Sequence, residues 1–352
     1  MSPAPAGSTT LSVGVIGAGD IARTAHVPVL KALAGARLDW VADVNSARSA
    51  EMGKAYKVPS RVLGNKPAEW PKADAILLAT PYGVRLPYYE HYRQQGAALY
   101  VEKPFARSAE EHGRICSWFP AHALASGLMM RSWSTNLMAR EIIDSQMFGA
   151  LRTARFAHGR PGLVTYGRYY LDQNKGGGGM VSEFGIHGID SLLFISRAQS
   201  AALDRVYTIE EGDLDLHTRA TLTLQLTGGQ TAQCEITVTG IEDLVEGVEL
   251  EFDDAILSYL LPGQGYALHG DAVDLRISVR PRRGAGASYH LTPRDPGAFP
   301  STKFQMFHDF WSRFLEGVRR GEPNHTTAAD AYLTTVVIDE IARERRRKAE
   351  SK

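Results

Sequence analysis

The sequence has little of several features that define other classes of protein. Its 352 residues include two cysteines, Cys116 and Cys234, which form no Cys-x-x-Cys pair. This fits a reducing compartment and argues against a cysteine-based metal site. No apolar run approaches the ~20 residues needed to cross a bilayer. The 39 basic and 39 acidic residues cancel, so no overall charge favours nucleic acid or an anionic membrane surface.

The first ten residues contain neither the basic cluster nor the apolar core of a signal peptide. Their Pro, Ala, Ser and Thr content predicts a flexible tail rather than a signal peptide. The remaining composition, with 44% hydrophobic and 22% charged residues, is that of a globular protein. We therefore expect a cytoplasmic protein, and its length predicts two domains.

The most informative stretch follows a predicted strand, Leu11–Ile16, and reads Gly17-x-Gly19-x-x-Ala22. This pattern predicts a tight turn into a helix whose N-terminus can hold a pyrophosphate. Gly17 allows the turn, Gly19 lets the backbone approach the phosphates, and Ala22 lets the helix pack on the strand. The cofactor contacts expected from this turn are Gly17, Gly19, Asp20 and Ile21.

A second predicted strand, Leu38–Val44, carries an acid near its end. This acid, Asp43, can accept hydrogen bonds from both ribose hydroxyls of NAD and repel the 2′-phosphate of NADP. Arg48, shortly afterwards, could instead reach such a phosphate. We predict NAD, with NADP not excluded. A glycine turn that binds nothing is the alternative interpretation of the pattern taken alone.

The first third of the chain alternates predicted strands and helices, which is typical of a doubly wound parallel sheet. Its strand Ala75–Ala79 is apolar without alternation, as expected for a parallel strand covered on both faces. The other predicted elements are strand Ala97–Val101, helices Ile21–Ala25, Val29–Leu33 and Tyr88–Gln95, and a closing unit, Ala109–Phe119 with Ala123–Met129.

The rest of the chain shows the alternation of antiparallel strands. Apolar residues alternate with polar ones over His217–Leu226 and again over 232–238, and Gly228-Gly229 lies between them. This predicts a hairpin with one buried face, and further strands are expected near 248–252 and 275–279. We predict an α/β protein with domains at residues 1–128 and 129–352.

Two long helices are predicted near the C-terminus. An apolar stripe from Phe304 to Val318 defines the first, which Gly321 ends. Thr327-x-x-Asp330 resembles a capping box for the second. The basic run that begins at Arg345 is expected to be a solvated helix end, where it favours the helix dipole.

Three further motifs carry polar residues to predicted strand or helix ends. Thr80-Pro81 and Glu102-Lys103-Pro104 each follow a strand at the carboxyl edge of the sheet, where doubly wound folds bind ligands. A glycine run, Gly176–Gly179, precedes a predicted helix on which Glu183, His187 and Asp190 share one face. These three side chains could in principle hold an ion, but no other histidine cluster supports this, and we expect no metal.

In order and spacing these motifs together resemble the Gfo/Idh/MocA family, and the resemblance spans nearly the whole chain. It rests on the glycine turn, on Ala42-Asp43-Val44-Asn45, on Thr80-Pro81, on Glu102-Lys103-Pro104 and on the glycine run before His187. The resemblance implies a Rossmann domain and an α/β domain with a large, mostly antiparallel open sheet. It also implies NAD(P)-dependent hydride transfer, most often at a hydroxyl of a sugar or cyclitol.

The resemblance further implies roles for individual residues. Lys103 and His187 would flank the reacting carbon, Glu183 would complete the set, and the Lys103–Pro104 peptide would be cis. The cofactor would also contact Thr80, Pro81, Glu102 and Lys103. The chemistry agrees, because hydride leaves a carbinol carbon only if the hydroxyl proton is removed. His187 has a suitable pKa range for a base, Lys103 can stabilise the oxygen, and Glu183 can orient the imidazole.

The sequence departs from the family pattern at two places. The family usually has aspartate where Glu183 stands, and Asn followed by His where Tyr82 and Arg85 stand. Contacts near the nicotinamide and the adenine should therefore differ from those of relatives.

Substrate contacts are expected from tyrosine, arginine and neighbouring residues, which suit sugar rings and hydroxyls. The alternative is a polar sheet edge or a contact in an oligomer. The glycine run would close over substrate or serve as a linker. The outer face of the open sheet predicts a homodimer or homotetramer. The candidate substrate residues are Arg131, Trp133, Tyr166, Arg168, Tyr169 and Lys175.

Two alternatives to a simple dehydrogenase remain. Transient redox of one substrate would give net epimerisation, elimination or glycoside cleavage. A regulator that only senses dinucleotide would need neither Lys103 nor His187, and both are present.

Overall fold

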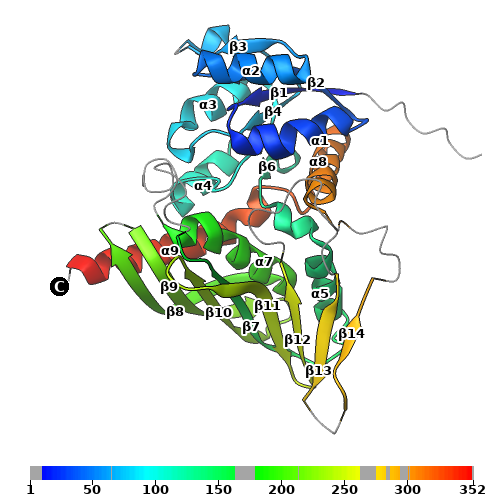
Figure 1. Ribbon diagram of the computed structural model, residues 1–352, viewed down its shortest axis with the longest axis vertical. Coiled ribbons are helices and arrows are strands. Elements are labelled where there is room, and N and C mark those ends of the chain that lie inside the picture. Colours follow the sequence, from blue (N-terminus) through cyan, green and yellow to red (C-terminus); the bar gives the residue numbers. More distant parts are fainter. Residues whose placement is uncertain are drawn as a thin grey trace, which may run out of the picture. The chain divides into compact units, whose positions relative to one another are not determined.

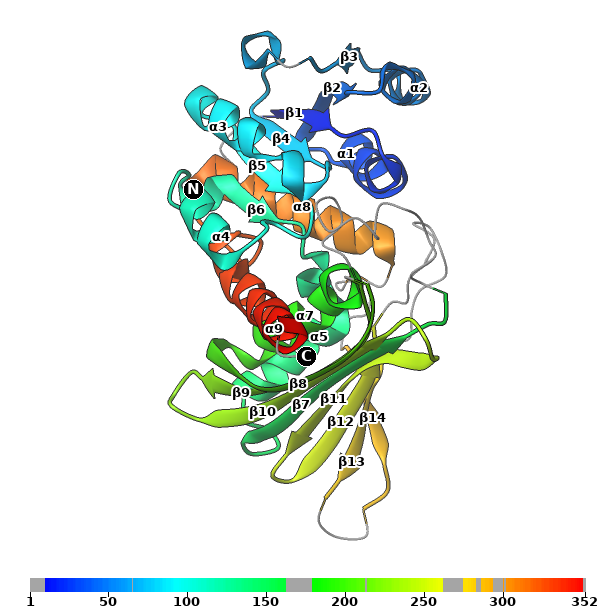
Figure 2. The ribbon, with the colours of Figure 1, turned by 90° about the vertical axis from the view of Figure 1, so that its left-hand side faces the viewer.

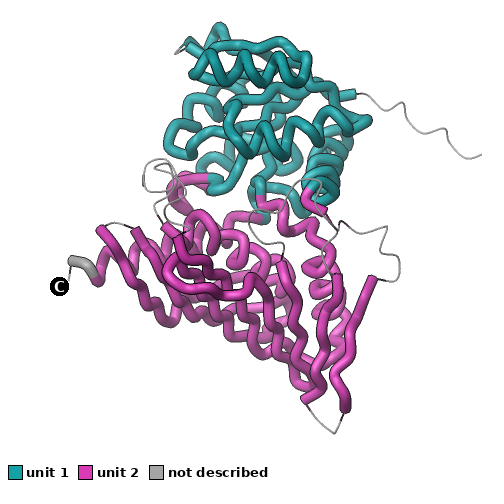
Figure 3. The backbone as a smooth tube through the Cα atoms, viewed as in Figure 1, with its two compact units in different colours: residues 1–105, 113–127, 304–330 teal, residues 106–112, 128–303, 331–352 magenta. Residues whose placement is uncertain are grey.

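The computed structural model describes residues 10–64, 66–162, 179–212, 214–261, 275–282, 286–293, 300 and 302–350. The chain forms two compact units, which Figure 3 shows in different colours. Unit 1 contains residues 1–105, 113–127 and 304–330, and unit 2 contains 106–112, 128–303 and 331–352. The units interleave along the chain, whereas the domains 1–128 and 129–352 remain a prediction.

Unit 1 contains a parallel sheet of six strands in the order β3-β2-β1-β4-β5-β6 (Figure 1). All of its strand pairs are parallel, which confirms the doubly wound sheet. From β1 the chain builds outward first to one side and then to the other, so β1 and β4 mark the switch point where such folds bind ligands. The strands are β1 Leu11–Ile16, β2 Ala36–Asp43, β3 Ser60–Val62, β4 Ala75–Leu78, β5 Ala98–Val101 and β6 Leu124–Ser126.

The first helix of unit 1 is one run where the sequence predicted two. A π turn, η1 (Ala22–His26), continues directly into α1 (Val27–Ala32). Gly321, with φ of +70°, follows the last residue of α8 as predicted. The other helices and turns up to residue 123 are α2 Ser46–Tyr56, η2 Pro67–Glu69, η3 Tyr82–Val84, α3 Leu86–Gln95, α4 Ala109–Cys116 and η4 Ala121–Ala123, and helix α8 is Lys303–Arg320.

Unit 2 contains a sheet of eight strands in the order β14-β13-β12-β11-β7-β10-β9-β8. The predicted hairpin is present, since β9 pairs with β10 in antiparallel register. All pairs in this sheet are antiparallel except β7 with β10, which is parallel. The strands are β7 Leu151–Gly159, β8 Ala198–Glu211, β9 Leu214–Leu226, β10 Thr231–Thr239, β11 Leu244–Phe252, β12 Ala255–Leu260, β13 Ile277–Pro281 and β14 Tyr289–Leu291.

Helices cover one face of this sheet (Figure 2). Helix α7 packs on β7 closely enough that a Cβ on Gly188 would overlap the ring of Phe156. Thr327 accepts a hydrogen bond from the Asp330 amide at 3.2 Å, which confirms the predicted cap before α9. The helices and turns in this part of the chain are η5 Met129–Ser132, α5 Ser134–Asp144, η7 Val181–Gly185, α7 Ile186–Ser196, η9 Ala329–Ala331 and α9 Tyr332–Glu350.

The start of the α7 run is held by a buried carboxylate, Asp215 of β9, which is 1% exposed. Its Oδ2 accepts hydrogen bonds from the Val181 amide and the Thr218 hydroxyl, both at 3.0 Å. Gly179 bridges to Asp215 in parallel register. Gly179 has φ of +132°, and a Cβ there would overlap Asp215 Oδ1. The last glycine of the predicted run is therefore required by this contact.

The prediction of a solvated basic helix end is wrong for Arg345. Its guanidinium contacts Glu210 at 2.7 Å and Asp215 at 3.0 Å, and its side chain is only 14% exposed. Lys348 donates to the Val206 carbonyl at 2.6 Å. The helix end packs against β8, and the buried charge of Asp215 recruits one of its arginines.

Unit 1 also contains a buried carboxylate with dedicated partners, Glu102. Trp311 of α8 donates from Nε1 to His26 Nδ1 at 2.9 Å, and His26 Nε2 lies 2.8 Å from Glu102 Oε1. Because an indole can only donate, Nδ1 accepts, and the imidazole donates its Nε2 proton to the carboxylate. Rings of Tyr100, Phe307 and Trp311 surround His26 edge-on.

Burial by itself would raise the pKa of Glu102. The hydrogen bond from His26 and the positive charges of Lys103 and Arg85 oppose burial, and the pKa is lowered overall. A folded-state pKa below the unfolded value means that the carboxylate stabilises the fold above the ordinary pKa of 4.5. That stabilisation is lost as the pH falls through the lowered pKa.

We expect Glu102→Gln to lower the free energy of unfolding by about 2 kcal/mol near neutral pH, because a charge-assisted hydrogen bond becomes a neutral one. The difference from the wild type should shrink as the pH falls from 4.5 towards the lowered pKa, because the unfolded carboxyl protonates before the native one. Urea unfolding across this pH range measures both effects. Glu69→Gln, which alters an exposed carboxylate 3.3 Å from Lys66, should change stability little. A difference that stays constant with pH would contradict this account of Glu102.

Candidate functional site

The glycine turn lies at the switch point of the parallel sheet in unit 1. Gly17 donates to the Ala42 carbonyl at 2.8 Å and has φ of +99°. A Cβ on Gly17 would overlap the carbonyl of Ala79, so no other residue fits there. At Gly19, by contrast, a Cβ would meet no atom within 4 Å in the part of the chain that the structure describes. The backbone at Gly19 therefore faces open space, which is what close approach by a phosphate requires.

Asp43 lies at the end of β2 and is 9% exposed. Its Oδ2 accepts the Ala18 amide at 2.7 Å, and its Oδ1 accepts the Asn45 amide at 2.8 Å. The carboxylate therefore fixes the glycine turn to the end of the neighbouring strand. Each carboxylate oxygen has a second acceptor site, so the predicted ribose contact is compatible with these bonds and stays a prediction.

The other predicted cofactor residues of this turn and of β4 have different surroundings. The side chain of Asp20 is 93% exposed and pairs with Arg23 at 3.1 Å, and Ile21 is half-buried. The Thr80 hydroxyl is buried and has no hydrogen-bond partner in the described part of the chain. Pro81 leads from Thr80 into η3.

These observations fit a dinucleotide. One edge of the sheet, where a helix begins, brings together four features. They are the required glycine turn, the open space beside Gly19, the acid at the end of β2 and the Thr80 hydroxyl, which has no partner among the described residues. Helix N-termini favour phosphate, because their amides point outward and the dipole is positive there.

The Glu102-Lys103-Pro104 turn follows β5 at the same edge. Its Lys103–Pro104 peptide is cis, as the resemblance implied. Glu102 is 5% exposed, while Lys103 is half-buried. Arg85, one of the departures from the family pattern, is 2% exposed and contacts the backbone of this turn.

In unit 2, Glu183 lies in the π turn η7, and His187 lies in the first turn of α7. Glu183 is half-buried and His187 is 7% exposed. The prediction that they share one helix face assumed regular α-helical spacing. The wider π turn changes the angle between the two side chains around the helix axis. π turns of this kind recur at functional sites.

Asp190, the third residue of the predicted face, forms a buried ion pair. Both of its oxygens accept from Arg131, at 2.6 and 2.9 Å, and Oδ1 also accepts from the Thr334 hydroxyl at 2.8 Å. The Arg131 guanidinium lies 5.5 Å from the centre of the Phe194 ring. Since Arg131 is 4% exposed, its predicted contact with substrate stays a prediction, and its visible role is to fix α7.

Trp133 is fully buried, and its indole N–H has no hydrogen-bond partner among the described residues. The hydroxyls of its neighbours Ser132 and Thr135 are also buried and have no partner within the described ranges. A buried unpaired donor costs about 1–3 kcal/mol, so three such groups within four residues are compatible with a polar ligand. Four other predicted substrate residues lie outside the described residues: Tyr166, Arg168, Tyr169 and Lys175.

The sequence did not predict the side chains that support these candidates. His26 and Trp311 hold Glu102, and Asp215 holds the start of the α7 run. No local pattern marks any of them, because each contact joins segments far apart in the sequence.

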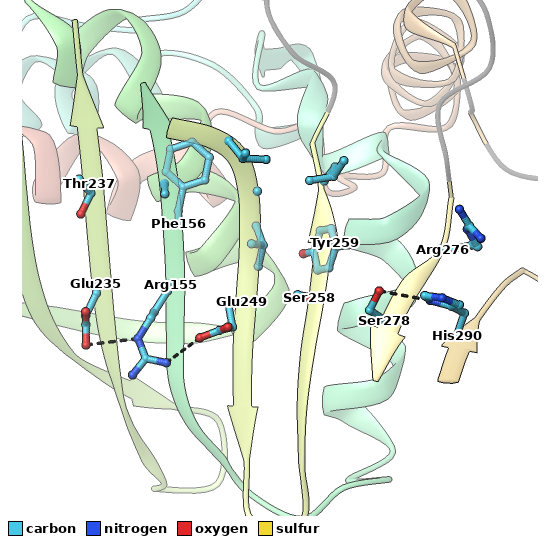
Figure 4. A pocket seen from close by; sticks show the side chains of 15 residues that line it. Arg155, Phe156, Glu235, Thr237, Glu249, Ser258, Tyr259, Arg276, Ser278 and His290 are labelled. Atoms are coloured by element: carbon cyan, nitrogen blue, oxygen red, sulfur yellow. Dashed lines mark hydrogen bonds and ion pairs between the residues drawn. The ribbon is translucent and has the colours of Figure 1, made fainter. Parts of the chain in front are cut away.

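A hollow of about 590 Å³ lies on the other face of the large sheet, over β7 and β10 to β14 (Figure 4). Arg155 on this face lies 3.4 Å from Glu235, 3.0 Å from Glu249 and 3.3 Å from Glu251. None of the predicted catalytic residues lines this hollow. It is therefore a feature of the open sheet face.

Two features are absent from the described residues. No helix there is both long and apolar enough to cross a membrane. No group of three or more His, Cys, Asp or Glu side chains is placed there to hold a metal ion.

Comparison with solved structures shows the same fold. A 3-ketoreductase from Actinomadura kijaniata, solved with NADP and TDP-benzene, superposes with a TM-score of 0.75 at 17% identity, covering 95% of this chain and 97% of that one. Levoglucosan dehydrogenase, solved with NADH and L-sorbose, gives a TM-score of 0.79 at 15% identity, covering 95% and 96% of the two chains.

Curated sequences also align over most of the chain. Inositol 2-dehydrogenase of Burkholderia cenocepacia is 25% identical over 343 residues, which span 95% of this chain and 94% of that protein. The enzyme of the same name from Agrobacterium fabrum is 29% identical over 160 residues, or 44% of this chain and 47% of that protein.

Two family profiles match consecutive segments of the chain. Residues 11–123 match the oxidoreductase family with an NAD-binding Rossmann fold, and residues 136–250 match the GFO/IDH/MocA C-terminal domain. Together the two segments cover more than half of the 352 residues. The chain therefore belongs to the Gfo/Idh/MocA family of oxidoreductases, enzymes with an NAD-binding Rossmann domain that act on CH–OH groups.

Proposed function

We propose that this enzyme transfers a hydride between nicotinamide and a secondary alcohol or ketone of a sugar, cyclitol or nucleotide-linked sugar. The observation that carries the proposal is the carboxyl edge of the parallel sheet. The glycine turn follows β1 and the Lys103 turn follows β5, and only β4 lies between these two strands. The names of the relatives, inositol 2-dehydrogenase and levoglucosan dehydrogenase, support this substrate class.

The cofactor would be held by the residues of this edge. When bound, NAD(P) supplies the hydride acceptor or donor at its nicotinamide ring. Asp43 favours NAD, because its carboxylate repels a 2′-phosphate, and NADP is not excluded. The proposed contacts are Gly17, Gly19, Asp20, Ile21, Asp43, Thr80, Pro81, Glu102 and Lys103.

The proposed chemistry uses one base and one cation. A ring nitrogen of His187 takes the hydroxyl proton during oxidation and returns it during reduction. The Lys103 ammonium donates a hydrogen bond to the same oxygen and stabilises its developing negative charge. Glu183 orients the imidazole of His187.

Substrate hydroxyls are proposed to meet polar groups from unit 2. The unpartnered donors near Trp133 are one source, and Arg131 is another. The predicted residues between 163 and 178 would supply the remainder. Tyrosine and arginine suit this task, since rings stack on C–H faces and guanidinium groups bind pairs of oxygens.

We expect His187→Ala and Lys103→Met each to lower turnover by about 10²–10⁴-fold, because a proton acceptor or an oxyanion partner is lost. A panel of sugars and cyclitols, starting with myo-inositol and levoglucosan, is run with NAD and with NADP while NADH or NADPH absorbance is followed. NADH binding, measured by fluorescence, should survive His187→Ala, whereas Lys103→Met also removes one proposed cofactor contact.

His122→Ala is the matched control, because His122 lies in η4 of unit 1, outside the proposed site, and should retain full turnover. Wild-type turnover in the His187→Ala variant would contradict the assigned base. Product formed without net NADH would instead indicate transient redox of one substrate.

We also propose that the open face of the large sheet joins two copies of the chain. Val245 and Leu260 line the hollow on this face and are 73% and 50% exposed. Two of the three glutamates around Arg155 also pair with Arg219 or Arg282, so the charges on this face largely cancel. A two-fold axis allows such a face to pair with itself.

We expect light scattering to give a mass of two or four chains for the wild type. The double change Val245→Glu and Leu260→Glu should lower it to one chain, because four like charges would meet across a two-fold interface. Met147→Glu, at a residue 59% exposed after α5, should leave the mass unchanged. A single-chain mass for the wild type at every concentration would contradict the proposal.

A further inference from the structure

Arg85 stands where the family pattern usually has histidine. It lies between η3 and α3 and is 2% exposed despite its charge. Neither the glycine turn nor the proposed catalytic residues explain why an arginine is buried at the carboxyl edge of the parallel sheet. Its hydrogen bonds give the reason.

Among the described residues, Arg85 donates hydrogen bonds to backbone carbonyls that lie just beyond the ends of strands. Nε and Nη2 donate to the Thr80 carbonyl, at 2.9 and 2.5 Å. Nη1 donates to the Pro104 carbonyl at 2.6 Å and to the Glu102 carbonyl. One guanidinium therefore joins the loop after β4 to the turn after β5, and it holds the residues on both sides of Lys103.

These carbonyls lie beyond the last ladder bonds of the sheet. The Glu102 amide donates to Leu78, and the Gly127 amide donates to Val101, which ends the pairing on either side of β5. Buried carbonyls need donors, and Arg85 supplies them. A neutral imidazole has one N–H and an imidazolium has two, whereas a guanidinium has five in one plane. The family's usual histidine could not make this set of bonds.

The charge of Arg85 is also balanced locally. Glu102 carries a buried carboxylate next to the same turn. Burial is the largest single influence on its pKa and raises it, but the hydrogen bond from His26 and the positive charges of Lys103 and Arg85 together lower the pKa overall. His26 fixes that carboxylate from the other side at 2.8 Å. The turn that carries Lys103 is thus held through its backbone by Arg85 and through the Glu102 side chain by His26.

We propose that Arg85 is a positioning residue that aims the Lys103 amine by clamping the backbone on both sides of it. The inference rests on the proposed role of Lys103. It also makes the Thr80-Pro81 loop and the Lys103 turn a single rigid element, so the two predicted cofactor contacts move together. Arg85 touches neither substrate nor cofactor in this account.

The test compares Arg85→Lys, Arg85→His and Arg85→Ala with the wild type. A shift of about 1 Å in a catalytic group can cost about 100-fold, so kcat should fall by about 10–100-fold while KM and the NADH dissociation constant change much less. Arg93→Ala is the control, because Arg93 lies on α3 but is exposed and stacks on Trp118 at 4.4 Å. It should retain wild-type kcat.

Two readouts separate positioning from simple destabilisation. Hydrogen–deuterium exchange of the cofactor-free protein should be faster in peptides covering 80–85 and 102–105 for Arg85→Lys, and unchanged elsewhere. Guanidinium ion at low concentration should raise the kcat of Arg85→Ala several-fold, while urea, which has the same shape without the charge, should not. If the alanine variant does not fold, the lysine and histidine variants carry the test.

Arg85→Lys and Arg85→His with kcat within about twofold of the wild type and unchanged exchange would overturn the inference. The outcome is separable from the proposed function. If Lys103→Met loses turnover and the Arg85 variants keep it, only the positioning role fails. If Lys103→Met keeps turnover, the role of Lys103 fails first.

Discussion

Side chains satisfy several backbone groups that lie beyond the ends of β1, β4 and β5, and the architecture of unit 1 depends on these bonds. Asp43 accepts the amide of the glycine turn, and Arg85 donates to three carbonyls after β4 and β5. A buried polar group left unpaired costs about 1–3 kcal/mol. The same side chains that avoid this cost also fix the turns that carry the candidate cofactor residues, so the edge is organised without any ligand.

Unit 2 applies the same principle to the helix that carries His187. Asp215 binds the amide of Val181 at the start of the run, and Asp190 pairs with Arg131 further along α7. His187 lies between these two anchors. Buried ion pairs contribute little net stability, because desolvation offsets the attraction. The value of the Asp190–Arg131 pair is therefore geometric, like that of the Asp215–Val181 hydrogen bond, since each ties this helical run to a different segment of the chain.

The sequence predicted the elements whose signal is local. The apolar run before Gly17, the unbroken apolar strand from Ala75 and the alternation around Gly228 each define a strand or turn without reference to distant residues, and all three are present. The cis peptide at Lys103–Pro104 followed from the family resemblance. The predicted roles of Lys103, Glu183 and His187 remain proposals.

What the sequence could not predict depends on distant pairing. The parallel register of β7 with β10 is set by the whole sheet. Arg345 was expected in solvent because its own helix suggests nothing else, and only the buried Asp215 explains its position. Arg85 was recognised as a departure from the family pattern, but its carbonyl partners lie in other loops.

The central claim is that the glycine turn after β1 seats the diphosphate of the cofactor, and substitution at Gly19 tests it most directly. A Cβ at Gly19 would meet no atom of the described residues within 4 Å, so Gly19→Ala and Gly19→Val should unfold at nearly the wild-type temperature. Calorimetric titration with NADH should nevertheless show affinity reduced by about tenfold or more, because the added carbons occupy the phosphate space. Unchanged NADH affinity in the folded Gly19→Val protein would contradict the account.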